Sequence, residues 1–239
     1  MSSSPIDNTR LLLGRRRNLL ATLTALRIGG GGGGGGTLPL PVNSLVIDVS
    51  HNDGTLVWSG MAAAGIRGVI IRCGYGDDDP AQDDTEFAAN IAGAVANNIP
   101  YGIYIYSYAT SLASAQSEAE HVQRLAAGLN PTLGIWWDSE EPGTELMARN
   151  CYNTWRNNML STGYSMCGVY ASTAWYNSYL SGVAGLHWVA DWGVNDGLPH
   201  TQPSIGGDTV DLWQYTSNKA ITGIGGSGIF DASLVLSGV

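Results

Sequence analysis

The chain has 239 residues and is 44% hydrophobic, with 8 Trp and 11 Tyr. This content is enough to bury a core, so a wholly disordered chain is excluded. The formal net charge of −9 at pH 7 argues against a nucleic-acid-binding surface. No stretch approaches the roughly 18 uninterrupted apolar residues that a membrane-spanning helix needs, so we expect no membrane span.

The beginning of the chain differs in character from the rest. Residues 1–28 hold five arginines and one aspartate, and their leucines recur at the spacing of one helical face. We therefore expect a basic amphipathic segment that docks onto a partner. A twin-arginine export signal is the alternative, because Arg16-Arg17 precede a short apolar stretch, but Arg27 interrupts that stretch. The run of eight glycines from Gly29 to Gly36 predicts that residues 29–43 form a flexible linker.

Beyond residue 43, short apolar runs alternate with longer amphipathic segments, a pattern typical of repeated β/α units. The apolar runs are expected to form strands at residues 45–49, 68–73, 101–106, 133–137, 167–171, 186–190 and 210–215. The amphipathic segments are expected to form helices at residues 86–97, 111–127, 145–160 and 174–180. The segment 44–239 is slightly shorter than the roughly 200 residues of an eight-unit barrel. We therefore predict an α/β fold, an irregular (β/α) TIM-like barrel with reduced helices in its last third.

Polar and aromatic residues stand at the carboxyl ends of most of these strands. They are Asp48, Arg72, Tyr106 and Tyr108, Asp138 and Glu140, Asp191 and Trp192, and Gln214 and Tyr215. The carboxyl ends of parallel strands meet at one end of an α/β barrel, where such folds place their active sites. The sequence therefore predicts one shared site at this end.

Asp138 and Glu140 are the most informative of these residues. Residues two apart on a strand point to the same face, so the two carboxyls are expected to meet at the barrel mouth beside Trp136 and Trp137. Like charges that are partly desolvated raise a carboxyl pKa, which keeps a general acid protonated near neutral pH. This arrangement suits a glycosidase. The alternative is that these acids only cap the next helix, a role also open to Glu141.

Five segments, read together, extend this interpretation. They are Val46–His51, Gln82-Asp83-Asp84 through Phe87 to Asn90, Tyr101–Ala109, Ile135–Glu140, and Leu212–Ser217 followed by Gly223 and Asp231. In this order they resemble the glycoside hydrolase family 25 muramidases over about residues 44–236. The resemblance implies that residues 44–239 form a catalytic barrel. The chain departs from the family pattern in two places: Ala232-Ser233 follow Asp231 where the family has Leu-Asn, and Asp191 replaces a neutral residue.

The resemblance also implies roles for the four acids. Glu140 would protonate the leaving oxygen of a β-1,4 bond between N-acetylmuramic acid and N-acetylglucosamine. Asp138 would orient the substrate's own 2-acetamido group as that group attacks the anomeric carbon. Asp48 and Asp231 would position sugar hydroxyls or water.

Several other residues are expected to bind the glycan. Flat rings at strand ends can stack on sugar faces while their polar tips stay wet. This favours Tyr106, Tyr108, Trp137, Trp192 and Tyr215 as substrate-binding residues, together with Arg72, Asp191 and Gln214. No metal or cofactor motif is present: the three cysteines are widely spaced, and the glycine run lacks the Lys-Ser/Thr of a phosphate loop.

Two functions from different classes remain open from the sequence. The first is a muramidase that cleaves bacterial peptidoglycan outside the cytoplasm, attached through residues 1–28 to a phage tail, a baseplate or another protein. The second is a glycan-binding or structural module on the same fold. The complete set of four acids favours the enzyme.

Overall fold

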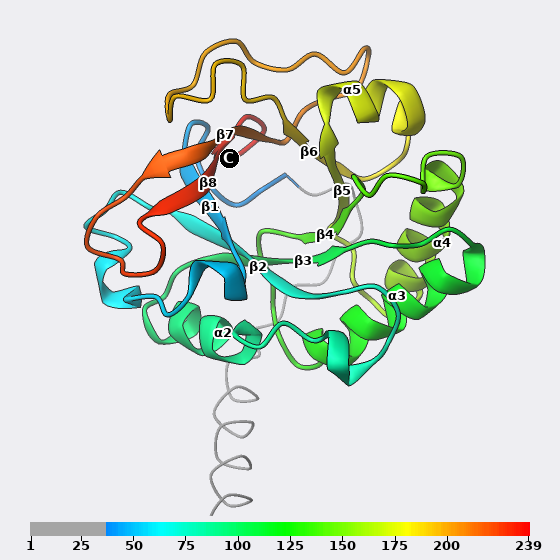
Figure 1. Ribbon diagram of the computed structural model, residues 1–239, viewed down its shortest axis with the longest axis horizontal. Helices are drawn as coiled ribbons and strands as arrows, with labels where there is room; N and C mark the ends of the chain where they lie inside the picture. The colour runs from blue at the N-terminus through cyan, green and yellow to red at the C-terminus, as the bar shows by residue number, and fades with distance from the viewer. Residues whose placement is uncertain (1–36) are drawn as a thin grey trace, which may run out of the picture.

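Eight strands close into a barrel in the computed structural model, which describes residues 37–239 (Figure 1). The strands are β1 (Leu45–Val49), β2 (Gly68–Tyr75), β3 (Tyr101–Tyr106), β4 (Ile135–Asp138), β5 (Cys167–Ser172), β6 (Leu186–Ala190), β7 (Leu212–Ala220) and β8 (Ile229–Val235). Strands β1 to β7 pair in parallel in chain order. Strand β8 is antiparallel to both β7 and β1 and closes the barrel. The predicted irregular α/β barrel is thereby confirmed.

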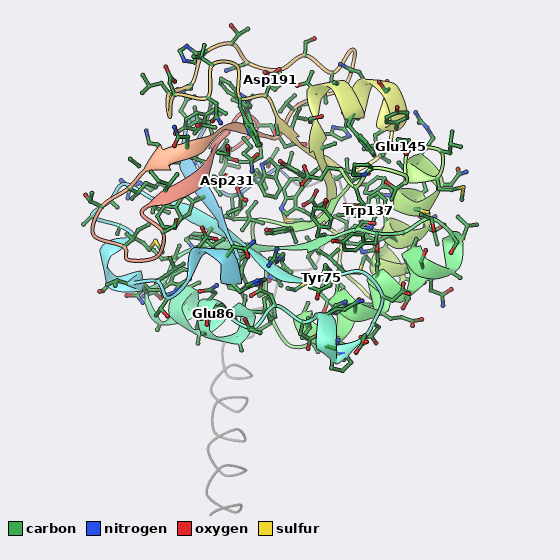
Figure 2. The ribbon with its side chains drawn as sticks, viewed as in Figure 1. Tyr75, Glu86, Trp137, Glu145, Asp191 and Asp231 are labelled. Atoms are coloured by element: carbon green, nitrogen blue, oxygen red, sulfur yellow. The ribbon has the colours of Figure 1, made fainter. Side chains whose placement is uncertain are left out.

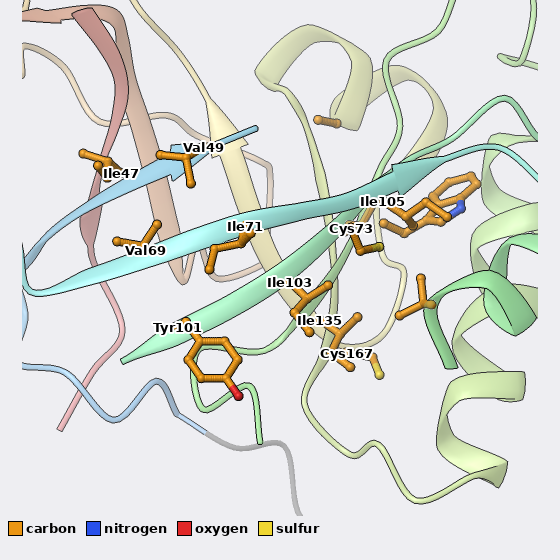
Figure 3. Close-up of a cluster of buried hydrophobic side chains, with 14 of the residues drawn as sticks. Ile47, Val49, Val69, Ile71, Cys73, Tyr101, Ile103, Ile105, Ile135 and Cys167 are labelled. Atoms are coloured by element: carbon orange, nitrogen blue, oxygen red, sulfur yellow. The ribbon is translucent and has the colours of Figure 1, made fainter. Parts of the chain in front are cut away.

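Side chains alternate between the inside and the outside of the barrel, because successive residues of a strand point to opposite faces. The inside holds a cluster built around Ile70, Trp136, Tyr170 and Trp188. The residues between them face outward and build the larger core beneath the helices, part of which Figure 3 shows with Ile47, Val69, Ile103 and their neighbours. This alternation decides which strand-end residues can reach the site.

Helices cover only part of the barrel. Helices α2 (Phe87–Ala96), α3 (Leu112–Ala126) and α4 (Ala148–Ser161) follow β2, β3 and β4. After β5 come only the short α5 (Thr173–Trp175) and the π-helical turn Tyr176–Leu180, and no helix joins β6 to β7. This confirms the predicted reduction of helices in the last third of the barrel. Within residues 37–239, no helix is long and apolar enough to span a membrane.

Strand β8 was absent from the sequence-based prediction. Its inward positions include Asp231 and Ser233, and polar residues at those positions break the apolar run that a buried strand normally shows. The strand exists because its backbone pairs on both sides, with β1 at Asp231 and with β7 at Ser233. The observed β7 is also longer than predicted and forms a hairpin with β8.

The predicted boundary between linker and barrel is wrong. Leu38 and Leu40 are buried in the interior cluster at the end of the barrel where the parallel strands begin. Leu38 also bridges to Gly238, and the amide of Asn43 donates to the carbonyl of Val235 at 2.8 Å. Residues 37–43 therefore belong to the barrel. The predicted basic segment 1–28 and the glycine run that follows it lie outside the described residues.

Candidate active site

Four carboxyl groups converge at the end of the barrel where the parallel strands finish. Asp48 on β1 and Asp231 on β8 are direct partners in the register of these strands, so their side chains lie side by side on the inner face. Asp138 is the last residue of β4, and Glu140 follows two residues later. Asp48 and Asp138 are buried, Asp231 is half-buried and Glu140 is exposed. Glu140 is thus the carboxyl most accessible to a ligand.

Burial and mutual repulsion raise the pKa of all four carboxyls. The pKa of Asp48 is raised by desolvation and then by Asp231, and that of Asp138 by desolvation and then by Glu140. Desolvation and the nearby Asp231 raise the pKa of Glu140. For Asp231, desolvation and Asp53 raise the pKa to about 6. The group therefore retains protons at a pH where isolated carboxylic acids have lost them.

Gln214 connects Asp48 to the rim of the site. Its Oε1 accepts hydrogen bonds from the Tyr170 hydroxyl at 2.8 Å and from Trp192 Nε1 at 2.9 Å. Because two donors fix the amide oxygen, the amide nitrogen must face the other way, and it donates to Asp48 Oδ2 at 3.0 Å. Gln214 thus joins two other predicted residues, Asp48 and Trp192, and it is also held by Tyr170, which the sequence did not indicate.

Arg72 supplies a positive charge to the same interior. Its charge opposes the rise in the pKa of Asp138, although desolvation and the other acids outweigh it. Arg72 Nε donates to the buried Asp84 at 2.9 Å, and Asp84 also accepts from the backbone amide of His51 at 3.0 Å. Asp84 therefore fixes both Arg72 and the turn that follows β1.

A cleft of about 390 Å³ opens beside Glu140. Its lining includes Tyr170, Thr173, Asp191 and Trp192. Asp191 accepts a hydrogen bond from the Thr173 hydroxyl at 3.0 Å, and the Trp192 ring is 40% exposed. Figure 2 shows Asp191 and Asp231 on one side of the molecule. The cleft combines acids with an accessible ring, as a sugar site requires.

Tyrosines form the opposite part of the rim. The Tyr106 hydroxyl donates to Glu141 Oε2 at 2.9 Å. Tyr108 is half-exposed and packs against both Tyr106 and Tyr75, with ring centroids 5.2 and 6.1 Å away. Tyr75 was missed because β2 extends beyond Arg72 through a bulge, which brings one more residue to the rim than the predicted strand allowed.

Two predicted substrate-binding residues do not reach the site. Trp137 is 1% exposed and packs outside the barrel against Tyr152, on the side of α4 (Figure 2). Tyr215 is 3% exposed and packs in the outer core against Trp213. Both immediately adjoin inward-facing residues, so strand alternation turns them outward. Of the expectation that Asp138 and Glu140 meet beside Trp136 and Trp137, the part that concerns Trp137 is therefore wrong, whereas Trp136 lies in the interior cluster.

The sequence model of the glycosyl hydrolases family 25 matches residues 47–224. The chain belongs to this family. Lysozyme M1 from Streptomyces globisporus, a curated relative, is 27% identical over 199 residues, which cover 75% of this chain and 64% of that protein. The chain therefore spans less than two thirds of that relative's length.

Solved structures share the barrel fold of this chain. The modular autolysin LytC from Streptococcus pneumoniae, in complex with a synthetic peptidoglycan ligand, superposes with a TM-score of 0.64 at 26% identity, over 80% of this chain and 46% of that one. The catalytic domain of the endolysin ply40 from bacteriophage P40 of Listeria monocytogenes has a TM-score of 0.64 at 24% identity, over 82% and 94% of the two chains. This second likeness supports the barrel fold alone.

Among residues 37–239, no group of three or more His, Cys, Asp or Glu side chains has the arrangement of a metal site. Cys73, Cys151 and Cys167 are all buried free thiols. The groups that the structure places at the mouth of the barrel include carboxyl groups, the Gln214 amide, the Arg72 guanidinium and aromatic rings.

Proposed function

We propose that the chain is a muramidase that hydrolyses the β-1,4 bond between N-acetylmuramic acid and N-acetylglucosamine in bacterial peptidoglycan. The observation that carries the proposal is the set of four carboxyls with raised pKa values in a family 25 barrel, one of which, Glu140, lines a cleft. The relation to lysozyme M1 and to an autolysin solved with a peptidoglycan ligand supports the same substrate class.

In the proposed reaction, Glu140 is the general acid. It is exposed in the cleft, where a glycosidic oxygen can approach it, and its raised pKa keeps the proton available. Glu140 transfers this proton to the leaving oxygen as the bond to the anomeric carbon breaks. Gln at this position keeps the shape but cannot donate the proton.

Asp138 is proposed to orient the 2-acetamido group of the muramic acid residue. The buried Asp138 Oδ1 has no hydrogen-bond partner among residues 37–239, so it is free to bond the acetamido N–H of a substrate. The acetamido oxygen then attacks the anomeric carbon from the face opposite the leaving group, and water later opens the ring that forms. Asp48 and Asp231 are proposed to place that water or the sugar hydroxyls.

The N-terminal segment is proposed to attach the enzyme to a carrier, such as a phage tail or baseplate, so that it acts outside the cytoplasm. The described chain begins at Thr37 and enters the barrel through Leu38 and Leu40, at the end opposite the carboxyls. Attachment there leaves the cleft facing away from the carrier. Co-sedimentation of the full chain with tail particles, and its loss on deletion of residues 1–36, tests this role.

Product analysis tests the activity and its bond specificity together. Purified peptidoglycan is digested, the new reducing ends are reduced with borohydride, and the resulting sugar alcohols are identified. A muramidase yields the alcohol of N-acetylmuramic acid. The alcohol of N-acetylglucosamine would contradict the proposed bond, and binding to the wall without new reducing ends would favour the glycan-binding module.

A further inference from the structure

A carboxyl group outside the barrel contacts the ends of β3 and β4, two of the strands that carry the site. Glu118 lies on α3 and is fully buried. Its Oε2 accepts hydrogen bonds from Trp137 Nε1 at 2.7 Å and from the Ser107 hydroxyl at 2.8 Å, and its Oε1 accepts from the backbone amide of Tyr108 at 2.8 Å. One carboxylate is therefore held by three donors, all from the ends of β3 and β4.

Each of these donors adjoins a residue of the proposed site. Trp137 immediately precedes Asp138 on β4, and Ser107 and Tyr108 immediately follow Tyr106 on β3. The two segments are also joined directly, because the amide of Ser107 donates to the carbonyl of Asp138 at 3.0 Å. A displacement of Glu118 would thus be transmitted to Asp138 through one covalent step at Trp137 and one hydrogen bond at Ser107.

The side chain of Asp138 has little support of its own. Its buried Oδ1 has no hydrogen-bond partner among residues 37–239. Its position therefore depends on the backbone of β4, which Glu118 fixes from the far side through the indole of Trp137. This gives a role to Trp137, a tryptophan that faces away from the glycan and stands next to Asp138.

The three hydrogen bonds to Glu118 suit its ionised form, which prevails above its raised pKa. An ionised carboxylate has two acceptor oxygens and accepts all three bonds, whereas the protonated form turns one oxygen into a donor and loses an acceptor position. Burial is the main cause that raises its pKa, to about 7, against the three hydrogen bonds, which lower it. Asp77, on the loop after β2, adds to the rise, and Cys151 on α4 lies close enough for its own pKa to be raised by Glu118.

We propose that Glu118 is a positioning residue, which holds Asp138 in the geometry for catalysis and holds Tyr108 at the rim. The inference rests on the proposed function of Asp138. Glu118, on helix α3 behind the strands, would thus affect the reaction without contact with the substrate.

Glu118→Gln is the decisive variant, because the amide keeps one accepting oxygen for Trp137 and Ser107 but sets an N–H against the N–H of Tyr108. We expect kcat on soluble peptidoglycan fragments to fall about tenfold or more, the factor that one hydrogen bond to a charged group carries. KM should change less than kcat. Glu120→Gln is the matched control: this residue lies on the same helix and is exposed, and its side chain bonds only Gln116 among residues 37–239, so its variant should keep kcat within about twofold.

Melting temperature and hydrogen exchange separate positioning from simple stability. Positioning predicts that kcat stays low at temperatures where Glu118→Gln is fully folded, and that the amide of Tyr108 exchanges faster. If kcat recovers in the folded variant, or equals that of Glu120→Gln, the inference is wrong. If Glu118→Gln fails to fold, Ser107→Ala removes one of the bonds more gently and must lower kcat in the same direction. An inactive wild-type chain would refute the proposed function instead. In that case, an unchanged exchange rate at the amide of Tyr108 in Glu118→Gln would still refute the positioning role of Glu118.

Discussion

Residues 37–43 are predicted to contribute a measurable part of the stability of the barrel. The perturbation is a pair of truncated chains, one that begins at Thr37 and one that begins at Ser44. The longer chain keeps Leu38 and Leu40, which are 1% and 8% exposed in the interior cluster, and the hydrogen bond from Asn43 to Val235. The shorter chain loses all of them and opens the floor of the barrel to water.

The size of the effect follows from the buried side chains. Burial of one leucine contributes about 1.5–3 kcal/mol, so the two leucines together contribute roughly 3–6 kcal/mol. For a domain of this size, each kcal/mol corresponds to roughly 2–4 °C in melting temperature, which gives a loss of roughly 6–24 °C. This is a large part of the total stability of a typical domain.

Thermal unfolding followed by circular dichroism is a suitable assay. The point variant Leu38→Ala should reproduce part of the loss, about 2–5 kcal/mol, while Val42→Ala, at a residue that is 50% exposed, should change little. If the two truncated chains melt within about 2 °C of each other, Leu38 and Leu40 do not stabilise the barrel, and residues 37–43 are a linker as the sequence predicted.

Three further predictions concern the carboxyl group cluster. Asp231→Asn removes the charge that, after desolvation, does most to raise the pKa of Glu140, so the alkaline limb of the pH profile of kcat/KM should move to lower pH; an unchanged limb would show that the two groups are not coupled. The folded pKa values of Asp48, Asp138, Asp231 and Glu118 lie above their unfolded values, so the folded chain binds more protons. Their contribution to stability is therefore lost as pH rises through those values, and the melting temperature should fall between about pH 5 and about pH 8; a rise over this range would contradict the raised values. If the acetamido group is the nucleophile, proton NMR should detect the β anomer as the first product, whereas initial α product would assign a water-activating role to Asp48 or Asp231.

Strand-end chemistry was largely predictable from the sequence. Asp48, Asp138, Asp191 and Gln214 each end or follow an apolar run, and the barrel brings them to one mouth because parallel strands finish at the same end. The prediction failed on which strand residues point into the barrel and which point outward. Trp137 lies between two inward residues of β4, so its outward direction could have been derived from the position of Asp138 alone.

Other features lacked a local signal. Tyr170 contacts Gln214, 44 residues away in sequence, and neither residue marks the other. Glu118 had a weak signal, since it is a charged residue among the buried Ala115, Ala119 and Val122 of its helix. Leu38 and Leu40 alternate with prolines directly after a glycine run, so their composition indicated a linker, and only the closed floor of the barrel explains why they are buried.

The rate at which Glu140→Gln releases reducing ends from soluble peptidoglycan fragments tests the central claim most directly. Glu145→Gln serves as the control, because Glu145 lies on the same loop and, within the described part of the chain, its side chain bonds only the amide of Gly143. General acid catalysis is worth about 10²–10⁴ in rate, so we predict that Glu140→Gln is at least about a hundredfold slower than the wild-type chain, with unchanged melting and retained glycan binding. A loss below about tenfold in a folded Glu140→Gln protein would remove Glu140 from its role and contradict the account.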